Sequence, residues 1–593
     1  MLYPQNNRFR TTIDLSGFWQ IRSDANDDGL KNEWFHGFTP EAEIAVPGSW
    51  NEQLSELGYM NYVGKMWYQT RFSVPDTLRE NRHFLHFGSA DFHALVWVNG
   101  NFAGEHSGGY LPFEFDISDL TESAKDNLLV VCVDNLLTHD TIPQGITEEN
   151  FREFNKERDQ SFPSTVFDFF AYGGIHRPVK LIGMPQSHLQ KIRLEPVISA
   201  ADGILKYRAE INVSPRNARL ELALFNGENC IMRQQAEASG EEFSGELKIE
   251  NCKFWSPENP HLYRLRFTLH VNGEAVDEYF LETGVREIRI EGEKLLLNGR
   301  PLFLKGFGKH EDFDVLGKGL SHPVIVKDFQ LMKWIGANSF RTSHYPYAEE
   351  IIQMADRMGF LVVDEVAAVS LNFKYVTGKT LENHKQAITE LIGRDCNHPS
   401  VIAWSIANEP GIWGEEEALS DYARKYWKEI YDHSKSLDVS RPVTLPTCPR
   451  LGEEDPGYKF VDFISVNRYW GWYEIPGNLE EAGNFFRKEL ENLYEKYKKP
   501  ILVTEFGADT IEGEHATYPQ LFTEEYQAIL IQTYFDIIES LPFMAGEHIW
   551  NFADFRTAQH HRRLVLNKKG VFTRQRQPKV AAFSIRKHWL REK

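Results

Sequence analysis

Hydrophobic and polar residues alternate in short runs along the first half of the chain. Up to about residue 184 the runs are separated by turn residues such as Asn99-Gly100 and Gly173-Gly174, and 83–87 and 128–133 are two of them. Alternation with a period of two and frequent tight turns are typical of β-sandwiches. We therefore predict a jelly-roll β-sandwich over 1–184. The same rhythm over 185–285 predicts an immunoglobulin-like β-sandwich, which has about 100 residues.

The rhythm changes after about Gly284, where strand-like and helix-like segments alternate. The helical segments carry apolar residues at spacings of three and four, as in Phe486, Leu490 and Leu493, which makes one apolar stripe. Eight units in about 300 residues predict a C-terminal (β/α)8 TIM barrel over 286–593. A doubly wound sheet is the alternative, but no Gly-rich nucleotide loop follows any strand. The predicted barrel strands are 303–307, 337–342, 361–366, 401–407, 442–446, 463–467, 501–505 and 548–552.

Composition and charge restrict the possible partners. The 593 residues include 65 basic and 85 acidic ones, for a net charge of −20, which disfavours nucleic acid or an anionic membrane. An anionic substrate would therefore need a local basic group. The start of the chain has no signal-peptide core and no later segment has membrane-span length, so we expect a cytoplasmic protein. Five cysteines without metal-finger spacing suggest free thiols.

Two glutamates are the strongest candidates for chemistry. Glu409 in 404–410 and Glu505 in 501–507 each stand where a buried, apolar strand gives way to polar or turn residues. Catalytic groups of barrels cluster at such strand ends. Cleavage of a glycosidic bond needs one carboxyl to protonate the leaving oxygen and a second to meet the oxocarbenium-like centre. For the nearby Arg341, Asp364 and Glu365, a buried charge-paired scaffold is an equal alternative.

Several motifs around these glutamates are specific: 46–49 (Val-Pro-Gly-Ser), 63–68 (Val-Gly-Lys-Met-Trp-Tyr), 172–177 (Tyr-Gly-Gly-Ile-His-Arg), 341–346 (Arg-Thr-Ser-His-Tyr-Pro) and 405–410 (Ser-Ile-Ala-Asn-Glu-Pro). On these motifs the chain resembles the β-glucuronidases of glycoside hydrolase family 2 over nearly its whole length. The resemblance implies a jelly roll, an immunoglobulin-like sandwich and a catalytic barrel, in that order. It also implies Glu409 as acid/base, Glu505 as nucleophile, Asn408 as the partner of the sugar 2-hydroxyl, and Tyr469 beside Glu505.

These roles imply a retaining enzyme, whose carboxyls lie about 5–5.5 Å apart. We expect burial and repulsion from Glu505 to raise the pKa of Glu409.

The resemblance also implies a site for the sugar carboxylate. The family signature Asn-x-Lys matches Asn567-Lys568-Lys569, and an ammonium with an amide donor would favour a carboxylate over a hydroxymethyl group. Arg563 aligns with a further family arginine, although Arg562 leaves the register open by one residue. A solvated lysine pair is the alternative for this segment, as is a strand-end cap for Asp168, which is implied to hold sugar hydroxyls. The rest of the implied pocket wall is His310, Asn467, Tyr473 and Trp550.

Two segments depart from the family pattern. Trp470 replaces a family tyrosine next to Tyr469, which suggests an altered pocket shape, and the short loop 369–379 predicts an open aglycone side. His560-His561 lacks a third ligand, so we expect no metal or other cofactor. The expected partners are a small-molecule β-glucuronide and further copies in a homo-oligomer, possibly a tetramer. The alternatives are a β-galacturonidase and a non-catalytic carbohydrate-binding protein.

Overall fold

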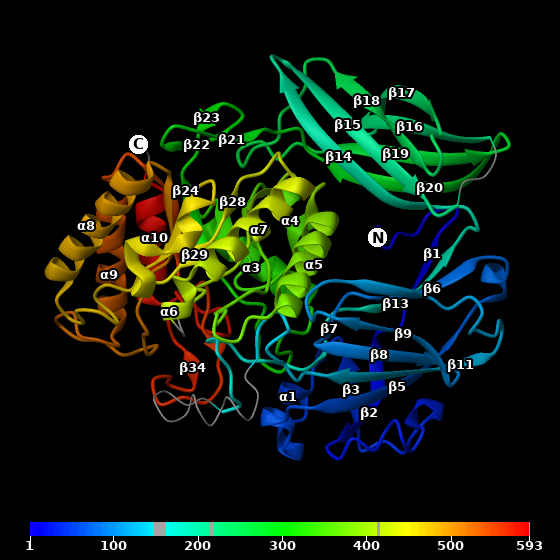
Figure 1. Cartoon of the computed structure of the whole chain (residues 1–593), viewed down its shortest axis with the longest axis horizontal. Coiled ribbons are helices and arrows are strands. Elements are labelled where there is room, and N and C mark those ends of the chain that lie inside the picture. The colour runs from blue at the N-terminus through cyan, green and yellow to red at the C-terminus, as the bar shows by residue number, and fades with distance from the viewer. Residues whose placement is uncertain (146–161, 214–216, 412–414, 592–593) are drawn as a thin grey trace.

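The computed structural model describes residues 1–145, 162–213, 217–411 and 415–591. Figure 1 shows two β-sandwiches on one side of the molecule and a barrel surrounded by helices on the other. The first sandwich is blue, the second runs from cyan to green, and the barrel continues to the red C-terminal helix. The predicted order of a jelly roll, an immunoglobulin-like sandwich and a TIM barrel is therefore present. No helix among the described residues is both long and apolar enough to cross a membrane.

The first sandwich has a six-stranded antiparallel sheet, β3-β2-β5-β11-β8-β9, and a four-stranded one, β1-β13-β6-β10, with a small third sheet, β4-β12-β7. Alternate residues of its central strand β11 face two different cores. Leu129 and Val131 join the main core, whereas Val130 and Cys132 pack with Trp67. Its strands are β1 Thr11–Asp14, β2 Gly17–Asp24, β3 Ala42–Val46, β4 Gly48–Ser49, β5 Lys65–Ser73, β6 Arg82–Phe87, β7 Ala90–Asp91, β8 His93–Val98, β9 Asn101–Ser107, β10 Phe113–Asp116, β11 Asp126–Asp134, β12 Gly174–Ile175 and β13 Val179–Met184, and its short helix is α1 Trp50–Gln53.

The second sandwich packs a three-stranded sheet, β14-β15-β18, against a four-stranded one, β17-β16-β19-β20. Leu220, Leu222 and Leu224 alternate along β16 and are fully buried between the sheets. This is the alternation that predicted the sandwich. Its strands are β14 Leu189–Ser199, β15 Asp202–Ile211, β16 Ala218–Asn226, β17 Asn229–Glu237, β18 Glu242–Ile249, β19 Tyr263–Val271 and β20 Glu274–Thr283.

The barrel sheet is parallel and has the order β28-β27-β26-β25-β24-β32-β31-β30-β29. Its two end pieces, β28 and β29, are separated only by Leu445, so they are halves of one fifth strand, and the eight strands close a barrel. The strands are β24 Leu304–Gly308, β25 Ser339–Arg341, β26 Leu361–Glu365, β27 Val401–Ser405, β28 Val443–Thr444, β29 Pro446–Thr447, β30 Ile464–Asn467, β31 Ile501–Glu505 and β32 Met544–Ile549.

The prediction for the eighth strand was wrong by several residues: it begins at Met544 and not at His548. Glu547 and His548 interrupt the apolar pattern, yet both are fully buried in this strand. Trp589 donates to Glu547 at 2.8 Å and His548 bonds to Ser339 at 2.9 Å, so distant parts of the chain satisfy these polar groups.

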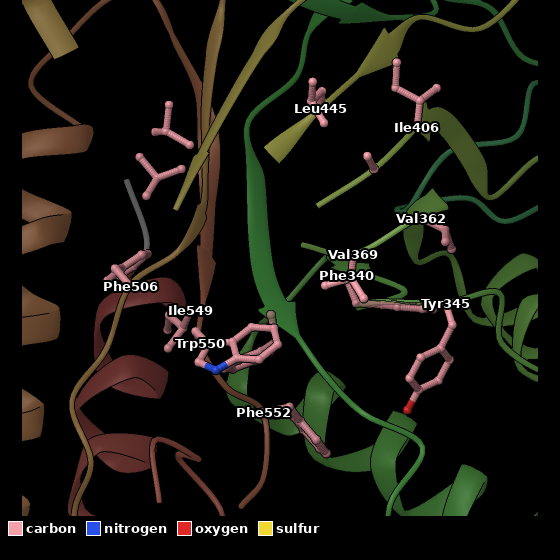
Figure 2. Packing of buried hydrophobic residues seen from close by; sticks show 14 of the residues in the cluster. Phe340, Tyr345, Val362, Val369, Ile406, Leu445, Phe506, Ile549, Trp550 and Phe552 are labelled. Carbon is pink, nitrogen blue, oxygen red and sulfur yellow. The ribbon is translucent and has the colours of Figure 1, made fainter. Parts of the chain in front are cut away.

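The helices surround the barrel strands and bury one face each. Thr377 begins α5 with a capping box, and a left-handed Gly336 ends α3. Figure 2 shows part of the resulting core, in which Phe340, Ile406, Leu445 and Ile549 come from different strands and strand ends around the barrel. The helices are α3 His322–Ile335, α4 Glu349–Met358, α5 Gly378–Asp395, α6 Glu415–Ala418, α7 Asp421–Leu437, α8 Leu479–Tyr497, α9 Glu524–Ile538 and α10 Val580–Trp589.

Two small hairpin sheets lie outside the barrel strands. The first, β21 Ile288–Glu291, β22 Lys294–Leu297 and β23 Arg300–Pro301, packs with Leu304, Leu361 and Leu502 at the first residues of barrel strands. The second, β33 Phe555–Arg556 and β34 Leu566–Asn567, follows β32 and therefore stands at the opposite, carboxyl end.

The first sandwich contacts the carboxyl end of the barrel. Glu311 and Asp312 follow β24, and they bond to Arg177 at 3.1 Å and to Tyr172 at 2.8 Å. Arg574, near the end of the chain, reaches Glu52 of the sandwich at 2.7 Å. This domain therefore forms one wall above the strand ends where barrels carry their active sites.

Candidate active site

Glu409 and Glu505 both lie at the carboxyl end of the barrel. Glu505 is the last residue of β31, and Glu409 follows β27 by four residues. Glu409 has a left-handed backbone with φ of 46°, and its N–H donates to the carbonyl of Pro446 at 2.8 Å. A non-glycine residue held in this conformation is fixed by its surroundings, which is common at functional sites.

Two asparagines connect the two glutamates. Asn467 donates to Glu409 Oε1 at 2.9 Å and to Asn408 Oδ1 at 3.1 Å, and its own oxygen accepts from Thr504 at 2.7 Å. Arg341 donates to the same Asn408 oxygen at 3.3 Å and also to Glu505. The Asn408 oxygen is therefore occupied, whereas its amide nitrogen has no hydrogen-bond acceptor within the described part of the chain. Asn467 is fully buried and holds other residues in place; the sequence suggested that it lines the pocket.

Both oxygens of Glu505 accept hydrogen bonds. Arg341 donates to Oε1 and the Tyr469 hydroxyl donates to Oε2 at 2.7 Å, which places Tyr469 beside Glu505. Arg341 is fully buried, and its other guanidinium nitrogen donates to Glu365 at 2.7 and 2.8 Å. Arg341 and Glu365 thus belong both to the scaffold and to the site, the two alternatives that the sequence left open.

Burial raises the pKa of both candidate carboxyls. The pKa of Glu505 rises to about 8, with the charge of Glu409 acting in the same direction as burial, while Arg341 and Tyr469 oppose the rise. For Glu409 the burial effect exceeds the opposing bond from Asn467, which gives the direction predicted from the sequence. Two side chains donate hydrogen bonds to Glu505, and one donates to Glu409. When the two carboxyl groups share one proton, these hydrogen bonds therefore favour Glu505 as the ionised member.

A second cluster of charges lies next to this pair. Lys569 is buried, and its ammonium donates to Tyr473 at 2.9 Å and to Asp509. Arg563 donates to Tyr473 at 2.8 Å and to Asp509 at 3.3 Å. Of the two candidate arginines, the side chain of Arg563 therefore enters the cluster. Lys569 also lies 5.7 Å from the ring centre of Tyr469, which brings the cluster close to Glu505.

Asp168 joins this cluster from the first sandwich. It accepts from Arg563 Nε at 3.0 Å and from Asn567 at 2.9 Å. The structure therefore brings together five residues that the sequence singled out, namely Asp168, Tyr473, Arg563, Asn567 and Lys569. We refer to these five together with Asp509 as the clamp.

His310 and Trp550 both pack against the ring of His344, whose Nε2 lies 3.7 Å from Glu505. His310 bonds to Tyr345 at 3.1 Å, and its buried Nε2 has no hydrogen-bond partner in the described part of the chain. Burial lowers the pKa of His310 well below its usual value, so its ring is neutral. Trp550 packs 4.9 Å from the His344 ring and 5.9 Å from the Arg341 guanidinium. A neutral ring with a free nitrogen suits a hydroxyl partner.

The sequence missed Asp509. It stands four residues after Glu505, in the loop that follows β31, so its position was a usable signal. Its role depends on Arg563 and Lys569, which are 54 and 60 residues further along the chain.

The sequence suggested a changed pocket shape at Trp470. Its indole donates to Glu489 at 2.9 Å and stacks on Phe485, both on α8. The short loop 369–379 packs its first residues inward, with Leu371 fully buried and the Ser370 N–H bonded to the Asn408 carbonyl at 2.8 Å. Among the described residues no group of three His, Cys, Asp or Glu side chains is placed to hold a metal ion.

A closed α/β barrel with two buried carboxyls at its strand ends, beside a polar clamp, defines a glycoside hydrolase. Three family models match the chain: "Glycosyl hydrolases family 2, sugar binding domain" over 13–185, "Glycosyl hydrolases family 2" over 187–286, and "Glycosyl hydrolases family 2, TIM barrel domain" over 288–592. The chain belongs to glycosyl hydrolase family 2.

Several proteins similar to this chain are named β-glucuronidase. A β-glucuronidase of Paenibacillus borealis is 39% identical over 99% of this chain and 98% of its own length. The human β-glucuronidase is 38% identical over 99% of this chain and 92% of its own. The structure of a Ruminococcus gnavus β-glucuronidase in complex with D-glucuronic acid superposes with a TM-score of 0.92 at 36% identity and covers 99% of both chains.

Proposed function

We propose that the protein is a retaining exo-β-D-glucuronidase, which hydrolyses β-D-glucuronides to D-glucuronate and an alcohol or other aglycone. The clamp next to Glu505 carries this proposal. Lys569 lies 5.7 Å from the ring of Tyr469, whose hydroxyl bonds to Glu505 at 2.7 Å. A single sugar ring has the length to place its anomeric carbon at Glu505 and its C6 carboxylate at Lys569. Relatives named β-glucuronidase over the full length support the same substrate.

In the first step Glu409 gives its proton to the glycosidic oxygen, and the Glu505 carboxylate attacks the anomeric carbon. The carbon–oxygen bond to the aglycone breaks and an ester to Glu505 forms. In the second step Glu409, now ionised, takes a proton from water, whose oxygen attacks the anomeric carbon and releases Glu505. Two inversions at one carbon leave the β configuration unchanged.

Other residues hold the sugar in place. The Asn408 amide would donate to the 2-hydroxyl, because its oxygen is already taken by Asn467 and Arg341. Tyr469 keeps Glu505 oriented. Asp168, His310 and Trp550 would contact the ring or its hydroxyls, and Lys569, Asn567, Arg563 and Tyr473 the carboxylate, since charged donors favour an anionic group.

The first test compares aryl β-D-glucuronide, β-D-galacturonide and β-D-galactoside as substrates of the wild type and of Lys569→Ala. We expect kcat/KM to favour the glucuronide by several orders of magnitude, and the variant to lose about 2–4 kcal/mol of that preference. Lys568→Ala is the matched control, since Lys568 pairs with Glu512 at 2.7 Å. If the enzyme prefers the galacturonide, the mechanism stands but the protein is a β-galacturonidase. If it turns over none of the three substrates, a non-catalytic carbohydrate-binding protein becomes the better explanation.

The proposal also covers the domain boundaries, the cellular location, the oligomeric state and the aglycone side of the site. The domain boundaries 1–184, 185–285 and 286–593 are supported by the matched ranges of the three family models. A cytoplasmic location is supported by five cysteines that are all free. A homo-oligomer, possibly a tetramer, stays a prediction that light scattering tests. The open aglycone side is tested by comparing large conjugates with a small aryl glucuronide.

A further inference from the structure

Asp509 is a buried carboxylate inside the clamp, the site proposed to bind the carboxylate of the sugar. Its residue exposure is 3%, and Oδ1 accepts from the backbone N–H of Lys568 at 2.9 Å. Oδ2 faces both cations of the clamp, accepting from Lys569 and, at 3.3 Å, from Arg563. Burial and a backbone bond fix this carboxylate in place, so a ligand cannot displace it without breaking the loop contact.

Asp168 occupies the other side of Arg563 and differs in accessibility. Its side chain is 46% exposed, against 5% for Asp509. Two cations, Arg563 and Lys569, therefore face two anions, which gives the empty clamp a formal charge of 2 − 2 = 0. An arriving carboxylate can take the place of the exposed Asp168 at Arg563, whereas Asp509 stays and competes with it for the same two cations.

We propose that Asp509 sets the affinity of the clamp for carboxylates, as a permanent counter-anion that weakens binding of the sugar acid and so lets glucuronate leave. This inference rests on the proposed function. A carboxylate this close to both cations cancels much of their attraction for a second anion, because like charges repel strongly in a partly buried site. A residue that only positions Lys569 would have the opposite effect, because its loss would weaken anion binding.

The test measures inhibition of aryl glucuronide hydrolysis by D-glucuronate and by the uncharged D-glucuronamide, for the wild type and Asp509→Asn. We expect the inhibition constant of glucuronate to fall at least about tenfold, with that of glucuronamide changed less than about threefold, because only the anion senses the lost charge. KM for the glucuronide should fall in parallel. Asp509→Glu, which keeps the charge, should restore wild-type inhibition.

Glu512→Gln is the matched control, because it neutralises the acid paired with the neighbouring lysine, Lys568. It should leave both inhibition constants unchanged. Glucuronate binding to Asp509→Asn that is unchanged or weaker overturns the proposal. If this variant does not fold, Asp509→Ser, which leaves room for water between the cations, gives the same two outcomes. A wild type without glucuronidase activity would refute the proposed function itself, whereas an active wild type with an unresponsive Asp509→Asn refutes only this inference.

Discussion

The surroundings of Glu505 and the clamp are built in different ways. Glu505 and Arg341 are the final residues of β31 and β25, and both are buried. The clamp residues come from loops and a short hairpin, and two of them, Asp168 and Tyr473, are exposed. The difference suggests a division of labour: strand ends hold the reacting groups rigidly, while loops recognise a group that differs among sugars.

The two regions also differ in how their charged side chains are paired. Arg341 lies between Glu365 and Glu505, so two fixed carboxyls share one buried cation. In the clamp, two cations share one fixed acid and one exposed acid. In the first region burial and the charge of Glu409 raise the pKa of Glu505 although Arg341 opposes the rise, whereas the second region leaves cationic donors that a ligand can use.

The largest expected effect is on catalysis, and it should distinguish the surroundings of Glu505 from the clamp by the range of substrates affected. Glu505→Gln should lower kcat by about 10⁴-fold or more for every substrate, because it removes the attacking oxygen anion. Lys569→Ala should affect only substrates with a carboxylate. The protein should still fold, since Arg341 keeps its bonds to Glu365.

In the wild type, mass spectrometry after treatment with a fluorinated glucuronide should find the label on Glu505. A label on another residue would break the comparison.

A smaller effect should follow from Tyr469→Phe. The Tyr469 hydroxyl lowers the pKa of Glu505, so its loss should raise that pKa above about 8. The nucleophile must be ionised, and activity is lost as the pH falls through its pKa. The acid limb of the kcat/KM profile should therefore move to higher pH, with kcat at neutral pH reduced about 10–100-fold. An unmoved acid limb would show that Glu505 does not titrate there.

The smallest effect should come from Asn467→Ala. It should appear in the alkaline limb of the pH profile of kcat/KM. The Asn467 amide lowers the pKa of Glu409, so its removal should raise that pKa. Glu409 must start protonated, and activity is lost as the pH rises through its pKa. The alkaline limb should move to higher pH while kcat falls about tenfold, since Asn408 also loses a partner. A shift of the acid limb instead would exchange the roles of the two glutamates.

Local pattern was enough to predict the three domains and most barrel strands. Strands such as Ile501–Glu505 are fully buried on both faces and begin in the sequence with an apolar run. Met544–Ile549 was placed incorrectly because Glu547 and His548 look like loop residues. Their partners, Trp589 and Ser339, are 42 and 209 residues away along the chain. Buried polar groups satisfied at long range are invisible to local periodicity.

The candidate site shows the same limit. Glu409, Glu505, Lys569 and Asp168 were selected by motifs, and the structure places them in one region. Asp509 belongs to no motif, and although its position after Glu505 was a signal, its role is seen only in its contacts with Arg563 and Lys569. Trp470 was weighed as a pocket residue because it neighbours Tyr469 in sequence, but its side chain points to Glu489 on α8. Tyr469 and Trp470 are neighbours along the chain, yet their side chains bond to different carboxyl groups, Glu505 and Glu489.

The pair Asp168–Arg563 joins residues that are 395 positions apart, and Glu52–Arg574 joins residues 522 apart. The pocket is therefore completed by segments that are made at widely separated times during synthesis. A nascent chain that stops before Arg563 does not hold a complete clamp, however well its first two domains have folded. Turnover of a glucuronide would thus report that the segments carrying Asp168 and Lys569 have both been made and have folded against each other.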